Sequence, residues 1–226
     1  MDDIRKKLRA LTAGNEEYAE FNRRIIVTGQ EILGVRMPEL RKLAKRLAGD
    51  MSADDVNNFI KLIDKQIYEE VLLAGLIIAY AKLTDREKIS LTRQYLKYVD
   101  NWGQVDTAVD SSYSSLDWWN FAKERSGSPD EFTVRYGVVL MMNFIKSDKL
   151  HEVLRVSRSV KHDGYYVKMA VAWLYATAAV RDYELTLREA RKLPEWTRKK
   201  ALTKMLESYR FTPAQKAEIR KLRAMW

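Results

Sequence analysis

The sequence predicts an all-α fold built from stacked pairs of helices. The first observation is periodicity, because apolar residues recur at intervals of three and four, as they do on one face of an amphipathic helix. Clear examples are Leu40, Leu43, Ala44 and Leu47, and then Val56, Phe59, Ile60 and Ile63. The second observation is that 226 residues contain only 9 glycines and 4 prolines, too few turn residues for a sandwich or barrel.

Local start signals divide the chain into helices. Three segments pair a Ser or Thr N-cap with a carboxyl or amide side chain three residues later: Ser52 to Asp55, Thr84 to Glu87 and Thr212 to Gln215. A fourth start is Ser128 to Glu131, where Pro129 predicts Ser128 as the N-cap and proline as the first helical residue. Pro38 and Pro194 open two further helical stretches.

Three longer segments are apolar on more than one face, which is typical of helices in the inner layer of an array. They are Val71 to Leu83, Val134 to Ile145 and Val167 to Val180. Helical pairs that repeat at roughly 40 residues indicate a HEAT-like solenoid, although the sequence has no strict internal repeat. With no low-complexity linker in the chain, we expect residues 1–226 to form a single HEAT-like helical-repeat domain with a concave basic groove.

Charge is distributed unevenly along the chain. The formal net charge is +9, yet residues 1–150 carry 23 Lys or Arg and 23 Asp or Glu, whereas residues 151–226 carry 17 and 8. This excess favours a polyanionic partner, and the alternative is a solvated face that maintains solubility. Cysteine is absent and there are only two histidines, so we expect no disulfide, metal site or cofactor.

The N-terminus lacks the basic and apolar segments of a signal peptide, and the longest apolar run, Val71 to Ala81, is too short to span a bilayer. We therefore expect a cytoplasmic protein that does not contact membranes. No oligomerisation segment is evident, and we expect a monomer. The sequence also lacks a glycine-rich phosphate loop and a serine elbow, which argues against phosphoryl transfer and triad hydrolysis.

The most informative local segment runs from Val99 to Asp106. If the chain is helical from Trp102, this side chain and Asp106 lie one turn apart on the same face. An aromatic ring beside a carboxylate suits a cation or a sugar that develops positive charge. The alternative is that Trp102 belongs to the core and Asp106 is a cap or an ion-pair partner.

Two residues are unusual in their apolar helices. Arg135 lies within Val134 to Ile145, where a charge needs a partner, and Trp173 lies inside Val167 to Val180. The structural alternatives are an intramolecular ion pair and core packing, respectively. Among the other tryptophans, we expect Trp118 and Trp119 in the core and Trp196 and Trp226 packed at helix edges rather than stacked on bases.

Taken together, four segments resemble the bacterial DNA alkylation-repair family of HEAT-like alkylpurine DNA glycosylases, the AlkD type. In chain order they are Ile32-Leu-Gly-Val-Arg-Met-Pro-Glu-Leu-Arg41, Asn101-Trp-Gly-Gln-Val-Asp106, Thr133-Val-Arg-Tyr136 and Lys168-Met-Ala-Val-Ala-Trp173. The sequence departs from the family at Arg36, where some members have glutamine, and at Ala176, where a basic residue can occur. Tyr18 is similar to an N-terminal tyrosine near the lesion.

The resemblance implies a monofunctional DNA glycosylase that hydrolyses the N-glycosidic bond of cationic N3- or N7-alkylated purines in duplex DNA, for base-excision repair. It assigns catalysis to Asp106, Trp102 and Trp173. It assigns DNA contacts to Arg135, Lys168, Arg36 and Tyr18. The rival expectations are a non-catalytic nucleic-acid-binding module and a scaffold for an acidic protein, since a fold does not fix a function.

Overall fold

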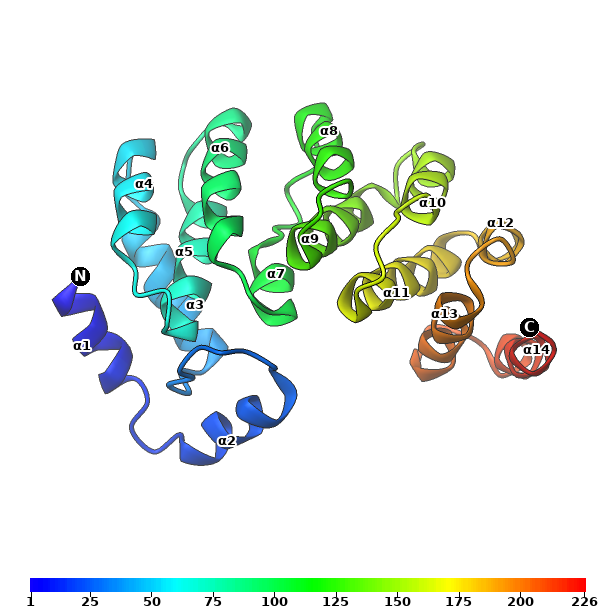
Figure 1. Ribbon diagram of the computed structural model, residues 1–226, viewed down its shortest axis with the longest axis horizontal. Helices are drawn as coiled ribbons and strands as arrows, with labels where there is room; N and C mark the ends of the chain where they lie inside the picture. Colours follow the sequence, from blue (N-terminus) through cyan, green and yellow to red (C-terminus); the bar gives the residue numbers. More distant parts are fainter. The chain divides into compact units, whose positions relative to one another are not determined.

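The computed structural model describes residues 1–226 and contains 14 α-helices, two short 3₁₀ helices and no strands (Figure 1). The predicted all-α class is confirmed. The chain divides into two compact units, which we call the N-terminal unit, Met1–Asp110, and the C-terminal unit, Ser111–Trp226. A single domain and a HEAT-like solenoid with a basic groove stay predictions.

The N-terminal unit is organised around one buried helix. Its helices are α1 (Asp2–Ala10), α2 (Glu16–Ile25), α3 (Met37–Ala48), α4 (Ala53–Leu62), α5 (Tyr68–Tyr80), α6 (Asp85–Tyr95) and α7 (Trp102–Ala108), with a 3₁₀ turn at Leu96–Tyr98. Helix α5 contacts α3, α4, α6 and α7, and every residue from Tyr68 to Ala79 is buried. The predicted inner segment Val71 to Leu83 thus corresponds to α5, which ends three residues earlier because the chain becomes extended at Ala81.

The C-terminal unit has a similar central helix. Its helices are α8 (Leu116–Arg125), α9 (Glu131–Met141), α10 (Leu150–Arg158), α11 (Tyr165–Arg181), α12 (Tyr183–Ala190), α13 (Glu195–Glu207) and α14 (Pro213–Met225), with a 3₁₀ turn at Met142–Phe144. Helix α11 contacts α9, α10, α12 and α13 (Figure 1). Trp118 and Trp119 of α8 are fully buried, as predicted.

Three of the four predicted capping segments form as expected. Ser52, Thr84 and Thr212 each cap a helix in a complete capping box. The prediction of Ser128 as an N-cap is wrong, because α9 begins at Glu131 and its N-cap is Asp130. The Asp130 carboxylate accepts the Thr133 N–H at 2.7 Å, while the Ser128 hydroxyl accepts the Asp130 N–H and closes the preceding turn.

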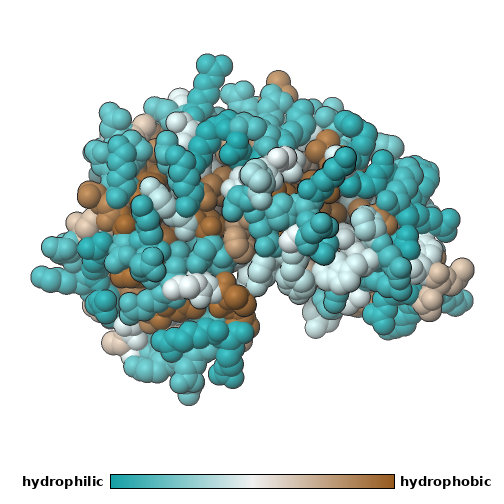
Figure 2. All heavy atoms as spheres, viewed as in Figure 1, coloured by the Kyte–Doolittle hydropathy of each residue, from teal (hydrophilic) through white to brown (hydrophobic).

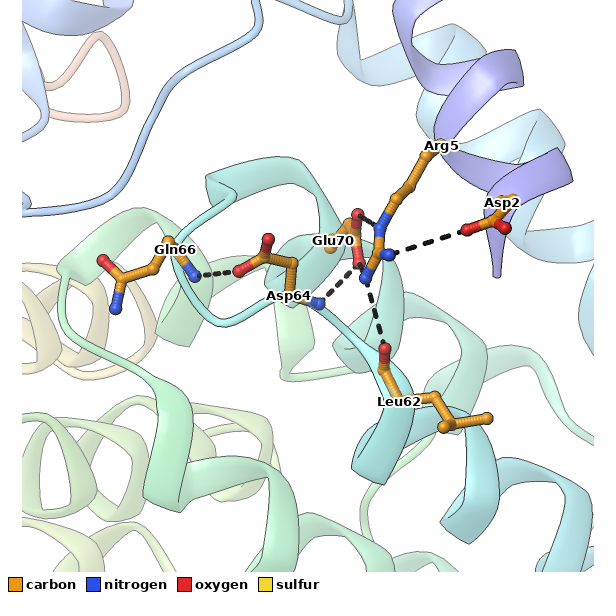
Figure 3. Close-up of polar contacts among 6 residues, drawn as sticks. All are labelled: Asp2, Arg5, Leu62, Asp64, Gln66 and Glu70. Carbon is orange, nitrogen blue, oxygen red and sulfur yellow. Dashed lines mark hydrogen bonds and ion pairs between the residues drawn. The ribbon is translucent and has the colours of Figure 1, made fainter.

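A buried carboxylate fastens α1 to the turn between α4 and α5 (Figure 3). The Glu70 side chain is fully buried, and its Oε1 accepts Arg5 Nε at 2.8 Å. Its Oε2 accepts the backbone N–H of Asp64 at 2.6 Å. Since an unpaired buried carboxylate is costly, Arg5 fixes the position of α1 on the rest of the N-terminal unit.

Candidate functional site

Helix α7 is short, and a buried cap sets where it begins. The side chain of Asn101, which is fully buried, accepts the backbone N–H of Gln104 at 3.1 Å. Asparagine is among the preferred N-cap residues because its oxygen satisfies a free N–H of the first turn. The helix therefore starts at Trp102, which meets the condition set in the sequence analysis, and Asp106 lies one turn further on the same helix.

Trp102 is half-buried and is anchored to α2. Its indole Nε1–H donates to the carbonyl of Ile25, the last residue of α2, at 3.2 Å. Asp106 is also half-buried. The alternative that Trp102 is a fully enclosed core residue is therefore wrong, and its indole is oriented by a hydrogen bond to a helix end.

Polar side chains tie the segment before α7 to the loop after α2. Asp100 accepts the Thr28 hydroxyl at 2.7 Å and donates its backbone N–H to Gln104 Oε1 at 3.2 Å. The Gln104 amide in turn donates to Gln30 Oε1 at 2.5 Å. A network in which the buried groups are paired rigidifies its surroundings, so the start of α7 has a defined position.

The hydroxyl of Tyr68 lies against the backbone of α7. A Cβ added at Gly103 would be 2.6 Å from this hydroxyl, so the helix approaches Tyr68 as closely as it does only because residue 103 is glycine. Burial raises the pKa of the Tyr68 phenol, and the negative charges of Glu69, Tyr18, Asp100 and Asp106 raise it further. The Tyr68 phenol therefore stays protonated and uncharged among acidic neighbours.

The loop before α3 wraps around a second buried carboxylate. Glu69 is 1% exposed and accepts the backbone N–H groups of Leu33 at 2.9 Å, Gly34 at 2.7 Å and Val35 at 3.3 Å. Burial raises the pKa of Glu69. The hydrogen bonds from the three backbone N–H groups lower it, but the effect of burial is larger. Gly34 has φ of +94°, and a Cβ there would be 2.6 Å from the Cβ of Ala19. The Gly-Val-Arg segment is thus shaped by Glu69 and by contact with α2.

This loop delivers Arg36 to Tyr18. The Arg36 guanidinium lies 5.2 Å from the centre of the Tyr18 ring, and its Nε donates to Asn15 Oδ1 at 2.9 Å. Arg36 is exposed and Tyr18 is half-buried. The structure therefore brings together two of the predicted DNA-contact residues at the first turns of α2, the helix whose last residue accepts the hydrogen bond from Trp102.

In the C-terminal unit, the side chain of Arg135 is buried, whereas a side chain that binds a DNA phosphate is normally accessible to solvent. It is 6% exposed, and its Nη1 donates to the carbonyl of Tyr166 at 2.9 Å. Glu131, one turn earlier on α9, accepts the Tyr166 N–H at 2.7 Å. Arg135 therefore orders the first turn of α11, and its contact with a DNA phosphate stays a prediction.

Trp173 is 38% exposed, so the alternative that it packs in the core is wrong. It lines a pocket of about 260 Å³ together with Lys204 and Glu207 of α13 and Arg210 of the following loop. Ala176, the position where a basic residue can occur in the family, also lines this pocket. Cationic side chains from α13 and the loop after it therefore lie beside Trp173.

Lys168, the remaining predicted residue, lies on α11 with its ammonium 5.2 Å from the centre of the Trp196 ring.

A family model described as DNA alkylation repair enzyme matches residues 4–205, which include all seven predicted site residues. This chain belongs to the DNA alkylation repair enzyme family. No curated protein and no solved structure matches it.

The two units of this alkylation-repair family member differ in charge. The N-terminal unit has 18 basic and 18 acidic residues, whereas the C-terminal unit has 22 and 13, so the whole excess of +9 belongs to the C-terminal unit. Figure 2 shows hydrophilic side chains over most of the face in view, with apolar patches between them.

No group of three or more His, Asp or Glu side chains could hold a metal ion, and no helix is long and apolar enough to cross a membrane.

Sequence reasoning missed the residues that position the predicted site of this family member. Asn101 and Gln104 form an N-cap pattern at a spacing of three, a signal that was present in the sequence. The role of Glu69 had no such signal, because its three partners lie 34 to 36 residues away in the chain.

Proposed function

We propose that this protein is a DNA glycosylase that hydrolyses the N-glycosidic bond of cationic N3- or N7-alkylated purines in duplex DNA. Membership of the alkylation-repair family supports a DNA substrate. The observation that carries the proposal is the pair on α7, in which a half-buried carboxylate, Asp106, lies one helical turn from an aromatic ring anchored to α2, Trp102.

The chemistry of the substrate explains why a single carboxylate is enough. A purine alkylated at N3 or N7 is cationic, and it leaves as a neutral base without needing a proton. Glycosidases that expel neutral leaving groups need a second carboxyl group as general acid. Here Asp106 stabilises the positive charge that develops on the deoxyribose and orients the attacking water.

The other predicted residues bind the substrate. Trp102 and Trp173 pack against the deoxyribose and contribute cation–π attraction to its developing charge. Arg135 and Lys168 contact the phosphate backbone, and Arg36 and Tyr18 contact DNA beside the lesion. No lysine acts as a nucleophile, so the enzyme releases the base without cutting the strand. We further propose that it acts as a monomer, without a cofactor or metal.

The test is release of N7-methylguanine and N3-methyladenine from alkylated duplex DNA by the wild type and by Asp106→Asn. The variant keeps the size of the side chain and removes its charge, so we expect the rate to fall by about 10²- to 10³-fold while DNA affinity is unchanged. Release from uracil-containing DNA is the control, because a neutral base is a poor leaving group for this mechanism. Equal release by the variant would refute the role of Asp106.

The charge of the C-terminal unit favours a second candidate, a non-catalytic module that binds nucleic acid. Its excess of +9 is sufficient for salt-dependent binding without chemistry. In that case the wild type binds alkylated and unmodified duplexes equally and releases no base. The same assay therefore separates the two functions.

A further inference from the structure

We infer that the C-terminal unit has a second nucleic-acid site, in which Trp196 stacks on the base of an unpaired nucleotide and Lys168 and Lys200 bind its flanking phosphates. The site shares Lys168 with the duplex-binding residues proposed above, but its ligand is an undamaged single strand, so its binding can be measured without base excision. It is formed by α11, by α13 and by the loops that precede them.

The aromatic part of the site is exposed. Trp196, which we expected to pack at a helix edge, is 38% exposed, and its neighbour Tyr165 is 53% exposed. The two rings meet edge to face with their centres 5.8 Å apart. Exposed aromatic surface is costly in water, and a stacked base covers it regardless of sequence.

The cationic part of the site is not neutralised. The ammonium groups of Lys168 and Lys200 lie 5.2 and 5.5 Å from the centre of the Trp196 ring. Neither lysine has a carboxylate within ion-pair distance, whereas Lys199, the residue next to Lys200, pairs with Glu195 at 2.6 Å. Both ammonium groups lie over the Trp196 ring without a carboxylate partner, so a base that stacks on the ring displaces them toward the phosphates that flank it.

A pocket of about 540 Å³ adjoins the Trp196 ring. The volume falls within the range of small-molecule sites and is large enough for a nucleotide. Its lining includes the apolar residues Val160, Val171 and Leu193 and the polar residues Lys161, Lys168 and Thr197. Arg158 also lines the pocket but is paired with Glu189 at 2.5 Å, which leaves Lys161 and Lys168 as the cations available to a phosphate.

The site lies on the same helices as Trp173. Tyr165 of α11 contacts Trp196 of α13, and eight residues further along each helix Trp173 and Lys204 line one pocket. The two helices therefore run in the same direction, and the two places are about 12 Å apart at a rise of 1.5 Å per residue. A strand that passes along α11 and α13 can reach both.

The combination favours a polynucleotide over an acidic polypeptide. An acidic peptide would use the lysines and leave the indole uncovered, since carboxylates do not stack on an aromatic face. A nucleotide in a strand uses the lysines through its phosphates and the indole through its base. A free mononucleotide has the same chemistry, but it lacks the further phosphates that would contact Lys204 and Arg210 next to Trp173.

The experiment compares the affinity of the full chain for an unmodified single-stranded oligonucleotide and for an abasic strand of the same length, by fluorescence anisotropy. We expect the wild type to bind the strand with bases more tightly. Loss of one stacked base costs about 5- to 150-fold, so Trp196→Ala should lose most of the preference for the strand with bases, while Trp196→Phe keeps most of it. Thermal unfolding of each variant verifies that it is folded.

Matched variants and competitors identify the ligand. Lys200→Ala should reduce the salt dependence of strand binding by about 0.7, the value for one phosphate contact on a single strand, and Lys199→Ala should change it less. Deoxythymidine monophosphate should compete only weakly if the ligand is a strand. Competition by polyglutamate as effective as that by the oligonucleotide, or a wild type that does not distinguish the abasic strand, would overturn the proposal.

Discussion

The two units differ in their balance of charge. The N-terminal unit has no net charge, and it buries two adjacent glutamates, Glu69 and Glu70, that bind backbone N–H groups and Arg5. The C-terminal unit has an excess of +9 and places two half-buried lysines, Lys168 and Lys200, at the Trp196 ring. The first arrangement fixes the positions of loops, whereas the second attracts a polyanion. Under the proposed function, Asp106 lies in the unit without net charge, and the excess charge that attracts DNA lies in the other unit.

The largest effect on the N-terminal unit should come from Glu69→Ala. The change leaves the N–H groups of Leu33, Gly34 and Val35 without their acceptor, and each buried donor so left costs about 1–3 kcal/mol. Because the donors of Gly34 and Val35 are fully buried, we expect the unit to lose about 2–6 kcal/mol, with faster amide exchange at these three residues. Glu39→Ala, at an exposed glutamate of α3, is the control. Unchanged exchange in Glu69→Ala would contradict the placement role.

The next effect concerns DNA affinity. Lys146, Arg181 and Arg210 of the C-terminal unit line one pocket of about 350 Å³, and none has an ion-pair partner. If all three contact phosphates, replacing them with alanine should reduce the slope of log K against log salt by about 2.7. The same change at three exposed lysines of the N-terminal unit, Lys6, Lys61 and Lys82, should leave the slope nearly unchanged. Equal losses would remove the contrast between the units.

The pH dependence of stability should have opposite signs at two buried glutamates. The pKa of Glu69 is raised by burial, so its contribution is present below its ordinary value of 4.5 and is lost as the pH rises through the raised value. The pKa of Glu189 is lowered mainly by its hydrogen bond to Lys192, and the positive charge of Arg158 lowers it to a smaller extent. Its contribution is present above 4.5 and is lost as the pH falls.

Thermal unfolding of two glutamine variants between pH 4 and pH 7 measures this difference. The stability lost in Glu69→Gln should shrink as the pH rises, and the stability lost in Glu189→Gln should grow. Parallel trends in the two variants would show that the two carboxylates are equivalent.

The smallest effect tests the corrected start of α9. Asp130→Ala removes the N-cap and should cost about 1 kcal/mol, whereas Ser128→Ala removes only the hydroxyl that closes the preceding turn and should cost less. The midpoint of urea unfolding compares the two variants. A larger loss for Ser128→Ala would restore the start predicted from the sequence.

The sequence was sufficient for the features that depend on local chemistry. Helical periodicity predicted α5 and α11, and the capping boxes at Thr84 and Thr212 form as the residue spacing indicates. The start of α7 at Trp102 was assumed rather than predicted, although the Asn101 cap that sets it is also a local signal. Such signals act within one turn of helix, so they can be recognised without knowledge of the fold.

Features that depend on distant contacts could not be predicted. Nothing in the local sequence distinguishes Trp173 from a core residue, because its exposure depends on how α13 packs beside α11. Likewise, the enclosure of Arg135 follows from the approach of Tyr166, 31 residues further along the chain. The predicted residues could therefore be named from the sequence, but their surroundings required the structure.

The weak packing of α2 has a consequence for dynamics. Only Ala19 is buried among its ten residues, yet the helix accepts the hydrogen bond of Trp102 and provides the Tyr18 ring against which Arg36 lies. Segments with few buried contacts open at low free energy, without unfolding of the whole protein. An opening of α2 would release Trp102 and Arg36 together. The protection of the α2 amides against hydrogen exchange is therefore a direct measure of how long both residues stay assembled.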